Sequence, residues 1–240
     1  MGQLRIDNTL ITYEERHSTR AKNLSITVAK GRVRVTIPVG ATVEQVLRFA
    51  EAKKQWVFKH VKNYNSISAQ MITKEYVAGE KFPYMGQELL LRTSSQPGKF
   101  TTIQLESDVV WVLISEDIPK GQWPEVIKKS LLYTYQKQAK KVFKEKLDHY
   151  AKIMGLQYNQ MRIKQQRTKW GSCSRKGNIN LNWKVLMAPT EVIDYLIVHE
   201  LAHLKHMNHS KEYWRFVESF MPGYKKSQKW LKENGEKLVI

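Results

Sequence analysis

Apolar and polar residues alternate along two short segments near the N-terminus. Segments 24–28 and 33–37 place an apolar residue at every second position, which is typical of strands with one buried face. The residues between them, 29–32, include Gly31 and are few enough to form a turn. The pattern therefore predicts a β-hairpin within a β-rich stretch that covers residues 11–37.

A helical pattern follows this stretch. Thr42 and Gln45 have the spacing of a capping box, in which each side chain bonds to the backbone N–H of the other residue. Apolar residues then recur at helical spacing to about Asn63, and lysines occupy the other side, so we expect an amphipathic helix. The apolar positions are Val46, Leu47, Ala50, Val57 and Val61.

The pattern returns to β structure over residues 76–114. The cluster 93–98, rich in Ser, Thr, Gly and Pro, marks a turn. The wholly apolar run 109–114 is short and contains β-branched residues, which is typical of a buried strand.

A long helix is predicted from Trp123-Pro124 to the residue before Gly155. Proline suits the first turn of a helix, and glycine is common directly after the last. Lysines crowd the polar side of this segment, at Lys128, Lys129, Lys137, Lys140, Lys141, Lys144 and Lys146. This side is the first candidate for contact with a polyanion, and a solvated face is the alternative.

The segment 118–122, which contains Pro119 and Gly121, is the predicted domain boundary. We expect a β-rich N-terminal part with one amphipathic helix at residues 1–120 and a catalytic part at residues 121–240. The fold class is therefore α+β. No internal repeat is visible in the sequence.

Two strands are predicted in the second half of the chain, at residues 161–166 and 178–182, and they bracket a loop at 170–174. In this loop Cys173 is expected to be a small packed residue rather than a nucleophile. Trp170 is expected to belong to the core.

The chemistry of the chain centres on the motif H-E-x-x-H at residues 199–203. On a helix, His199 and His203 lie on one face and can hold one cation, and Glu200 can act on a water as general base. Pro189-Thr190 is a helix start signal with Thr190 as N-cap, and Asn208 is a candidate left-handed stop. The apolar residues around the motif predict a buried helix, in which unpaired polar side chains would be unfavourable.

Three residues compete for the third metal ligand. His209 has the third-histidine spacing of H-E-x-x-H-x-x-G-x-x-H, although His206 stands in the glycine place. Glu218 would suit a site with two histidines and a glutamate. His206 lies about 10 Å along a helix from His199, at 1.5 Å per residue, which is far for a shared ion. Spacing therefore favours His209 over Glu218 and His206.

Further roles around the motif remain open. Asp194 and Glu212 are candidate partners for the second ring nitrogen of a ligand histidine, or simply helix N-terminal charges. An oxyanion stabiliser is also expected, for which the candidates are Tyr213, Tyr224, Lys169 and Arg167. Trp214 and Phe216 are expected to pack against the metal helix.

The amino-acid composition shows a large excess of positive charge. The 240 residues carry 40 Lys+Arg against 22 Asp+Glu, a formal net charge of +18. This excess is typical of proteins that contact nucleic acid or another polyanion, and a solvated basic surface is the alternative. No apolar run reaches the length of a membrane span, and residues 1–5 are not followed by an apolar signal core. With one cysteine, Cys173, we expect a soluble, cytoplasmic protein without an internal disulfide.

Three motifs carry a resemblance to a known family. Residues 167–174 (RTKWGSCS), 179–183 (INLNW) and 199–210 (HELAHLKHMNHS), with Trp214, resemble the YgjP-like metallopeptidases and, more distantly, the SprT-type zinc proteases. The likeness extends from about residue 13 to residue 230.

The resemblance implies a zincin-like catalytic fold with one zinc ion. It implies the ligands His199, His203 and His209, and Glu200 as the catalytic base. It also implies that strand 161–166 or 178–182 supplies the edge that pairs with an extended substrate.

The sequence as a whole predicts a zinc-dependent metallopeptidase that acts on a protein or peptide substrate. The alternative is a nucleic-acid-associated protease or binding factor that uses the basic surface. A zinc hydrolase acting on a non-peptide amide is a third possibility. The oligomeric state and the natural substrate have no signature in the sequence.

Overall fold

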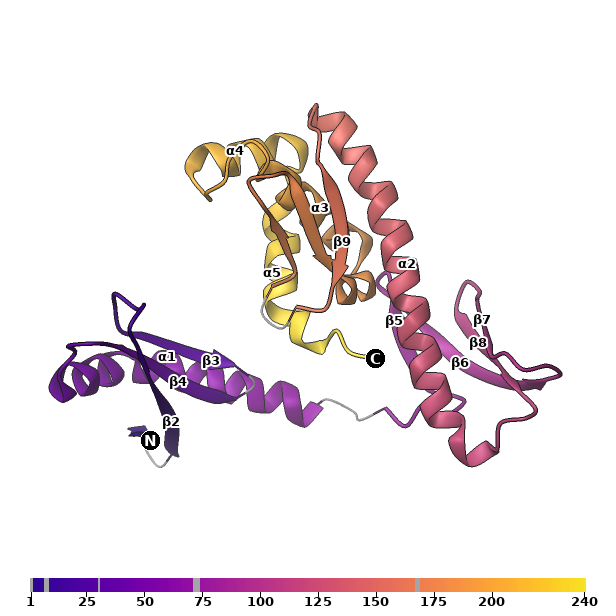
Figure 1. Ribbon diagram of the computed structural model, residues 1–240, viewed down its shortest axis with the longest axis horizontal. Helices are drawn as coiled ribbons and strands as arrows, with labels where there is room; N and C mark the ends of the chain where they lie inside the picture. Colours follow the sequence, from indigo (N-terminus) through magenta and orange to yellow (C-terminus); the bar gives the residue numbers. More distant parts are fainter. Residues whose placement is uncertain (1, 7–8, 30, 71–73, 167–168) are drawn as a thin grey trace. The chain divides into compact units, whose positions relative to one another are not determined.

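The computed structural model describes residues 2–6, 9–29, 31–70, 74–166 and 169–240, without the side chains of residues 6 and 63–70. The chain forms two compact units, Met1–Ile72 and Thr73–Ile240, both drawn in Figure 1. Each unit contains strands and helices, so the predicted α+β class is confirmed.

The first unit contains one four-stranded sheet. Its strands are β1 (Gly2–Ile6), β2 (Thr9–Ser18), β3 (Ser25–Ala29) and β4 (Arg32–Pro38), in the order β1-β2-β4-β3. Val28 lies opposite Val33 in the antiparallel pair of β3 and β4, which confirms the predicted hairpin. β2 and β4 pair in parallel, and such a long-range pairing leaves no local signature in the sequence.

One helix, α1 (Val43–Gln70), packs on this sheet. The N–H of Thr42 donates to Oε1 of Gln45 at 3.0 Å, and the N–H of Gln45 donates to Oγ1 of Thr42 at 3.3 Å, which confirms the capping box. The helix continues beyond the predicted end at Asn63. Of its predicted apolar side, Leu47 is exposed, and the residues buried with the sheet are Val46, Ala50 and Val57.

The second unit begins with another four-stranded sheet. Its strands are β5 (Lys81–Tyr84), β6 (Gln87–Gln96), β7 (Thr102–Leu105) and β8 (Val109–Ser115), in the order β5-β6-β8-β7. The predicted buried strand is β8, in which Val110, Val112 and Ile114 are fully buried.

The turn predicted over residues 93–98 is wrong for its first four residues. Thr93 to Gln96 continue β6 and pair in parallel with β8. The partner strand satisfies the backbone of this polar segment, so the tertiary pairing overrides a local composition that favours a turn.

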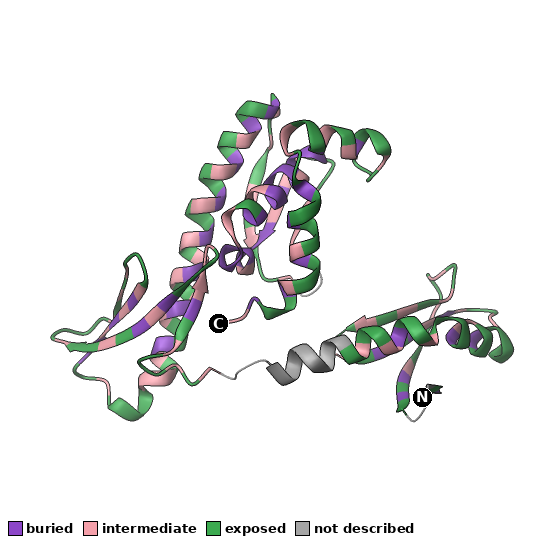
Figure 2. Cartoon of the chain, turned by 180° about the vertical axis from the view of Figure 1, so that it is seen from behind, coloured by how far each residue is buried: buried purple, intermediate pink, exposed green. Residues whose placement is uncertain are grey.

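A short 3-10 helix, η1 (Lys120–Gln122), leads into the long helix α2 (Trp123–Met154). Gly155 follows in a left-handed conformation with φ of 64°, so both predicted ends are confirmed. Buried and exposed residues alternate along α2 in Figure 2. The buried stripe consists of Ile127, Leu131, Tyr135, Ala139, Phe143, Leu147, Ala151 and Met154.

The second unit adds a three-stranded sheet, which lies beside α2 in Figure 1. Its strands are β9 (Gln160–Lys164), β10 (Gly171–Cys173) and β11 (Asn178–Asn182), in the order β10-β11-β9. The two predicted strands are confirmed as β9 and β11. The predicted loop between them contains a third strand, β10, which pairs antiparallel with β11.

The remaining elements are η2 (Trp183–Met187), α3 (Thr190–Ala202), α4 (Lys211–Phe220), α5 (Tyr224–Asn234) and η3 (Gly235–Lys237). Helix α3 packs against α2, and Lys146 on α2 forms an ion pair with Asp194 on α3 at 2.6 Å. Lys146 is therefore part of a helix–helix contact and not of the open lysine face. Within the described ranges, no helix is both long enough and apolar enough to cross a membrane.

The division at Ile72/Thr73 differs from the one predicted near residue 120. Residues of β5, β6 and β8, among them Phe82, Leu91 and Val112, share one buried core with α2 and α3. Because α2 needs this sheet to cover its apolar stripe, residues 73–120 belong with residues 121–240.

The two four-stranded sheets share one topology. In each, the first two strands pair antiparallel, the second and fourth pair in parallel, and the third and fourth pair antiparallel. Each sheet is followed by a long helix, α1 or α2. The sequence reveals no repeat because the equivalent strands share a pattern of burial more than they share residues.

Candidate active site

The candidate active site is built on α3, whose interior carries the H-E-x-x-H motif. Most of its residues from Val192 to Ala202 are apolar and buried, as the sequence predicted. Thr190 is its first helical residue, preceded by Pro189 at the N-cap, so the predicted cap is wrong by one position. The helix ends at Ala202, so the second histidine of the motif, His203, is the C-cap. Its backbone keeps right-handed helical angles.

The helix ends earlier than expected because the chain turns directly after the motif. The N–H groups of Lys205 and His206 both bond to the carbonyl of Ala202, at 3.1 and 3.0 Å. No left-handed residue occurs at Asn208, so the predicted stop there is wrong. The tight turn brings His209 back toward the helix.

His199, His203 and His209 form one group of ring nitrogens. One nitrogen from each ring lies within 4.8 Å of the other two. Nε2 of His209 is 3.3 Å from Nε2 of His199. Neither His206 nor Glu218 belongs to this group of described residues.

This spacing fits a zinc ion. Two nitrogens that are each about 2.0–2.1 Å from a tetrahedral ion lie about 3.4 Å apart. Nε2 of His199 and Nε2 of His209, 3.3 Å apart, are thus at the separation of two ligands of one ion, and neutral imidazole is a preferred zinc ligand. The three residues therefore suit a three-histidine site with a fourth position open.

Two hydrogen bonds orient the rings. Nδ1 of His203 donates to the carbonyl of His206 at 3.1 Å, which leaves Nε2 of His203 free for a metal. Nδ1 of His199 is 3.4 Å from the hydroxyl of Tyr195, one turn earlier on α3. The carbonyl of His206 and the side chain of Tyr195 thus have the orienting role for which the sequence offered Asp194 and Glu212.

Asp194 and Glu212 are engaged elsewhere. Asp194 pairs with Lys146, as described above. Glu212 is exposed in the first turn of α4, where hydrogen bonds to the backbone and to Ser210 lower its pKa. Their alternative interpretation, as helix N-terminal charges, fits Glu212 directly.

The environment favours the neutral form of His199 and His203. Burial, together with the neighbouring His203 and His209, lowers the pKa of His199 to about 3. Burial also lowers the pKa of His203, against the bond to His206, which raises it. Neutral rings are the form in which histidine binds a metal.

Aromatic side chains pack around the three rings. Trp214 on α4 stacks on His209 with centroids 5.5 Å apart and lies 5.9 Å from His199. Phe216 instead contacts His206 in the turn after the helix. The predicted packing of Trp214 on the metal helix is confirmed, and Phe216 packs on the adjoining turn.

Glu200 is buried, with 3% of its surface exposed. Its Oε2 has no hydrogen-bond partner among the described residues. Burial raises the pKa of Glu200 to about 8, although the positive charge of Lys169 acts in the opposite direction. An unpartnered buried carboxyl is unfavourable in a purely structural role, so the residue has a free oxygen for chemistry.

Gly171 makes room for this carboxyl group. A Cβ at Gly171, the first residue of β10, would lie 2.3 Å from Oε1 of Glu200. Any larger residue would displace the carboxyl group. The sequence offered no role for Gly171, although its place beside the conspicuous Trp170 was a weak signal.

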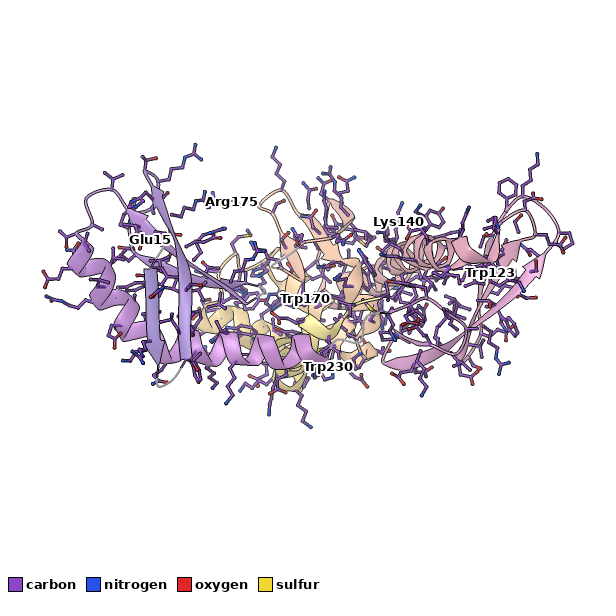
Figure 3. The ribbon with its side chains drawn as sticks, turned by 90° about the horizontal axis from the view of Figure 1, so that it is seen from below. Glu15, Trp123, Lys140, Trp170, Arg175 and Trp230 are labelled. Atoms are coloured by element: carbon purple, nitrogen blue, oxygen red, sulfur yellow. The ribbon has the colours of Figure 1, made fainter. Side chains whose placement is uncertain are left out.

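A cavity of about 310 Å³ opens beside Glu200. Its wall combines β10, α3 and α5, and it includes Lys169, Trp170, Gly171, Tyr195, Leu196, His199, Glu200, Gln228, Leu231 and Lys232. Trp170, labelled in Figure 3, packs on Gly235 and also lines this cavity, so it is only partly a core residue.

Of the four candidate oxyanion stabilisers, Lys169 lies in this cavity wall with Glu200. The hydroxyl of Tyr213 donates to the carbonyl of His199 at 3.0 Å, and Tyr224 is buried against Trp214. Arg167 lies outside the described residues.

Cys173 is half-buried at the end of β10. Burial raises the pKa of its thiol to about 11, and the charge of Glu200 adds to this effect. The thiol is therefore protonated near neutral pH, and no imidazole is bonded to it among the described residues. This environment agrees with a packed residue and not with a nucleophile.

Comparison with known proteins identifies the chain. The model of the YgjP-like metallopeptidase domain matches residues 22–234. The chain belongs to the YgjP-like metallopeptidase family. Membership makes it a metal-dependent peptidase and agrees with the resemblance carried by the motifs around Trp170 and His199.

Solved structures similar to the chain include two metallopeptidase zymogens. Abylysin of Pyrococcus abyssi is 33% identical over 38% of this chain and 93% of its own, with a TM-score of 0.35. Jannalysin of Methanocaldococcus jannaschii is 22% identical over 40% of this chain and 97% of its own, with a TM-score of 0.34. No curated protein matches the chain.

Proposed function

We propose that this metallopeptidase uses zinc, held by His199, His203 and His209, with Glu200 as general base. The observation that carries the proposal is the convergence of three imidazole rings beside a buried carboxyl group with an unpartnered oxygen. Zinc bound there would supply a Lewis acid that polarises a peptide carbonyl and lowers the pKa of a water molecule.

Glu200 moves the proton in this scheme. Oε2, which has no partner among the described residues, accepts a proton from the attacking water and then delivers it to the leaving amine. Burial raises the pKa of Glu200, which makes its carboxylate a stronger proton acceptor than an exposed one.

β10 supports the binding of an extended substrate. One edge of β10 pairs with β11, and within the described ranges no strand pairs with its other edge. Gly171 on β10 contacts Glu200, so a substrate strand added to the free edge would run past the catalytic carboxyl group. The sequence-based choice of strand 161–166 or 178–182 is therefore replaced by β10, since β11 is central and β9 lies on the far edge.

The substitution Glu200→Gln tests this proposal. It keeps the shape of the side chain and removes its ability to take a proton. We expect peptide hydrolysis to fall by a factor of about 10² to 10⁴, the usual contribution of general base catalysis, with zinc content unchanged. Hydrolysis at the wild-type rate by the zinc-loaded variant would exclude Glu200 as the base.

A groove on α2 supports a second candidate function, the binding of nucleic acid. The groove measures about 1000 Å³ and runs between the C-terminal half of α2 and β9. Lys140, labelled in Figure 3, is one of five lysines in its wall, with Lys137, Lys141, Lys144 and Lys152. Lys144 pairs with Asp148, and Glu145 is the other acidic residue of the wall, so positive charge prevails.

Binding of single-stranded DNA at low salt tests this second function. We expect an affinity that falls steeply as salt is raised and that the combined change Lys137→Glu, Lys140→Glu and Lys141→Glu removes. The same change of charge at Lys225, Lys226 and Lys229 on α5 is the matched control. Glu200→Gln should leave DNA binding intact, and unmeasurable affinity of the wild type at low salt would exclude this function.

A further inference from the structure

The cavity beside Glu200 is placed to receive a group of the substrate next to the reacting bond. Glu200 and His199 both form part of its wall. A volume of about 310 Å³ accommodates a side chain and is too small for a folded domain. A substrate group that enters this cavity is therefore separated by only a few covalent bonds from the bond on which Glu200 acts.

The inner wall of the cavity is apolar. It consists of Trp170, Tyr195, Leu196 and Leu231, and of these all but Trp170 are buried in the core. Such a surface packs against the methylene groups of an entering side chain and holds little water.

The mouth of the cavity is basic. Lys169 precedes β10, and Lys232 lies on α5, so two cations reach the cavity from separate elements. Neither lysine has an ion-pair partner among the described residues. Gln228, one turn before Lys232, adds an exposed amide. The one carboxyl group in the wall is Glu200, which the proposed mechanism reserves for the proton.

We propose that this cavity is a substrate subsite that selects a carboxylate, with Lys232 and Lys169 as the residues that determine the specificity. The proposal rests on the proposed peptidase function and names its substrate class: peptides with an acidic group adjoining the cleaved bond. That carboxylate can belong to an Asp or Glu side chain or to the C-terminus of the peptide. In both cases the apolar wall packs on the carbon chain and the lysines pair with the charge.

Matched quenched-fluorescent peptides test the proposal with the zinc-loaded full chain. One pair differs by Glu against Gln at the positions flanking the cleaved bond, and a second pair differs by a free against an amidated C-terminus. We expect kcat/KM to favour the acidic member of one pair by about tenfold, as two partly exposed ion pairs would supply. The pair that shows the preference identifies the source of the carboxylate.

Lys232→Glu should abolish or reverse this preference, because the substituted carboxylate repels the acidic peptide. Lys229→Glu is the matched control: it makes the same change of charge on the same helix, and Lys229 does not line the cavity. Lys229 forms only an exposed ion pair with Glu233 at 3.9 Å, so its loss affects stability little.

Equal kcat/KM within both peptide pairs, or a preference that survives Lys232→Glu, would overturn the proposed subsite. Failure of the proposed peptidase function gives a distinct result: the zinc-loaded chain would then cleave no peptide of either pair. In that case calorimetric binding of the same peptides decides the matter: tighter binding of an acidic member that depends on Lys232 supports the subsite, and equal binding refutes it.

Discussion

Glu200 and Gly171 are far apart in the sequence and in contact in the structure. The motif predicts His199 and His203 as metal ligands and Glu200 as general base, because residues four apart on a helix lie on one face. No spacing rule connects a glycine on a strand to a carboxyl group on a helix, so Gly171 becomes visible only when β10 lies beside α3.

Gly171→Ala should therefore impair catalysis without removing the metal site. The added Cβ would lie 2.3 Å from Oε1 of Glu200, so the carboxyl group must move. We expect kcat/KM to fall by about 10²-fold, since a misplacement near 1 Å is enough for such a loss.

Gly121→Ala is the matched control for this change, because a Cβ there meets no atom within 4 Å. Steady-state kinetics and zinc analysis of both variants make the comparison. Full activity of the Gly171→Ala variant would contradict this prediction, because it would show that the added Cβ does not displace the carboxyl group of Glu200 from a working position.

The sequence also did not predict which groups orient the rings of His199 and His203. The sequence suggested carboxylates, Asp194 and Glu212, as partners for the histidines. The structure instead uses the hydroxyl of Tyr195 and a carbonyl in the turn at His206. A carbonyl acceptor has no residue signature, because every residue carries one.

At the scale of elements, helices and strands were predicted correctly where the hydrophobic pattern extended over many residues. Helix α2 repeats an apolar stripe over many turns and is bounded by proline and glycine, so both ends were predictable. β10 has three residues, too few for any periodicity, and it was predicted as a loop. It is nevertheless the strand on which Gly171 approaches the carboxyl group of Glu200.

Leu131→Ala tests the role of α2 as the common support of the sheet and α3. Leu131 is fully buried in the shared core, so we expect its truncation to lower the free energy of unfolding by about 2–5 kcal/mol. Tyr133→Ala on the same helix is the control, since that side chain is 69% exposed. Urea unfolding curves measure both, and equal losses would contradict the packing described for α2.

At the scale of the molecule, the boundary between units was misplaced because composition changes near residue 120 while packing changes near residue 72. Pro119 and Gly121 mark a turn between β8 and α2 and not a linker. The shared topology of the two four-stranded sheets was equally invisible, since it resides in strand order and not in residue identity.

Truncated chains test this division. Residues 73–240 contain the whole core of the second unit, so this fragment should fold cooperatively and bind zinc. Residues 121–240 lack β5–β8 and leave the stripe of α2 uncovered, so this fragment should aggregate or remain unfolded. Circular dichroism and thermal melts compare the two, and a stable fold of the shorter fragment would restore the boundary predicted from the sequence.

Zinc content is the measurement that tests the central claim most directly. The claim is that the ring nitrogens of His199, His203 and His209 hold one ion together. Metal analysis should give about one zinc per chain for the wild type and for Glu218→Ala, and a large loss for His209→Ala. Loss of zinc in Glu218→Ala with retention in His209→Ala would contradict this ligand set and require a site of two histidines and a glutamate.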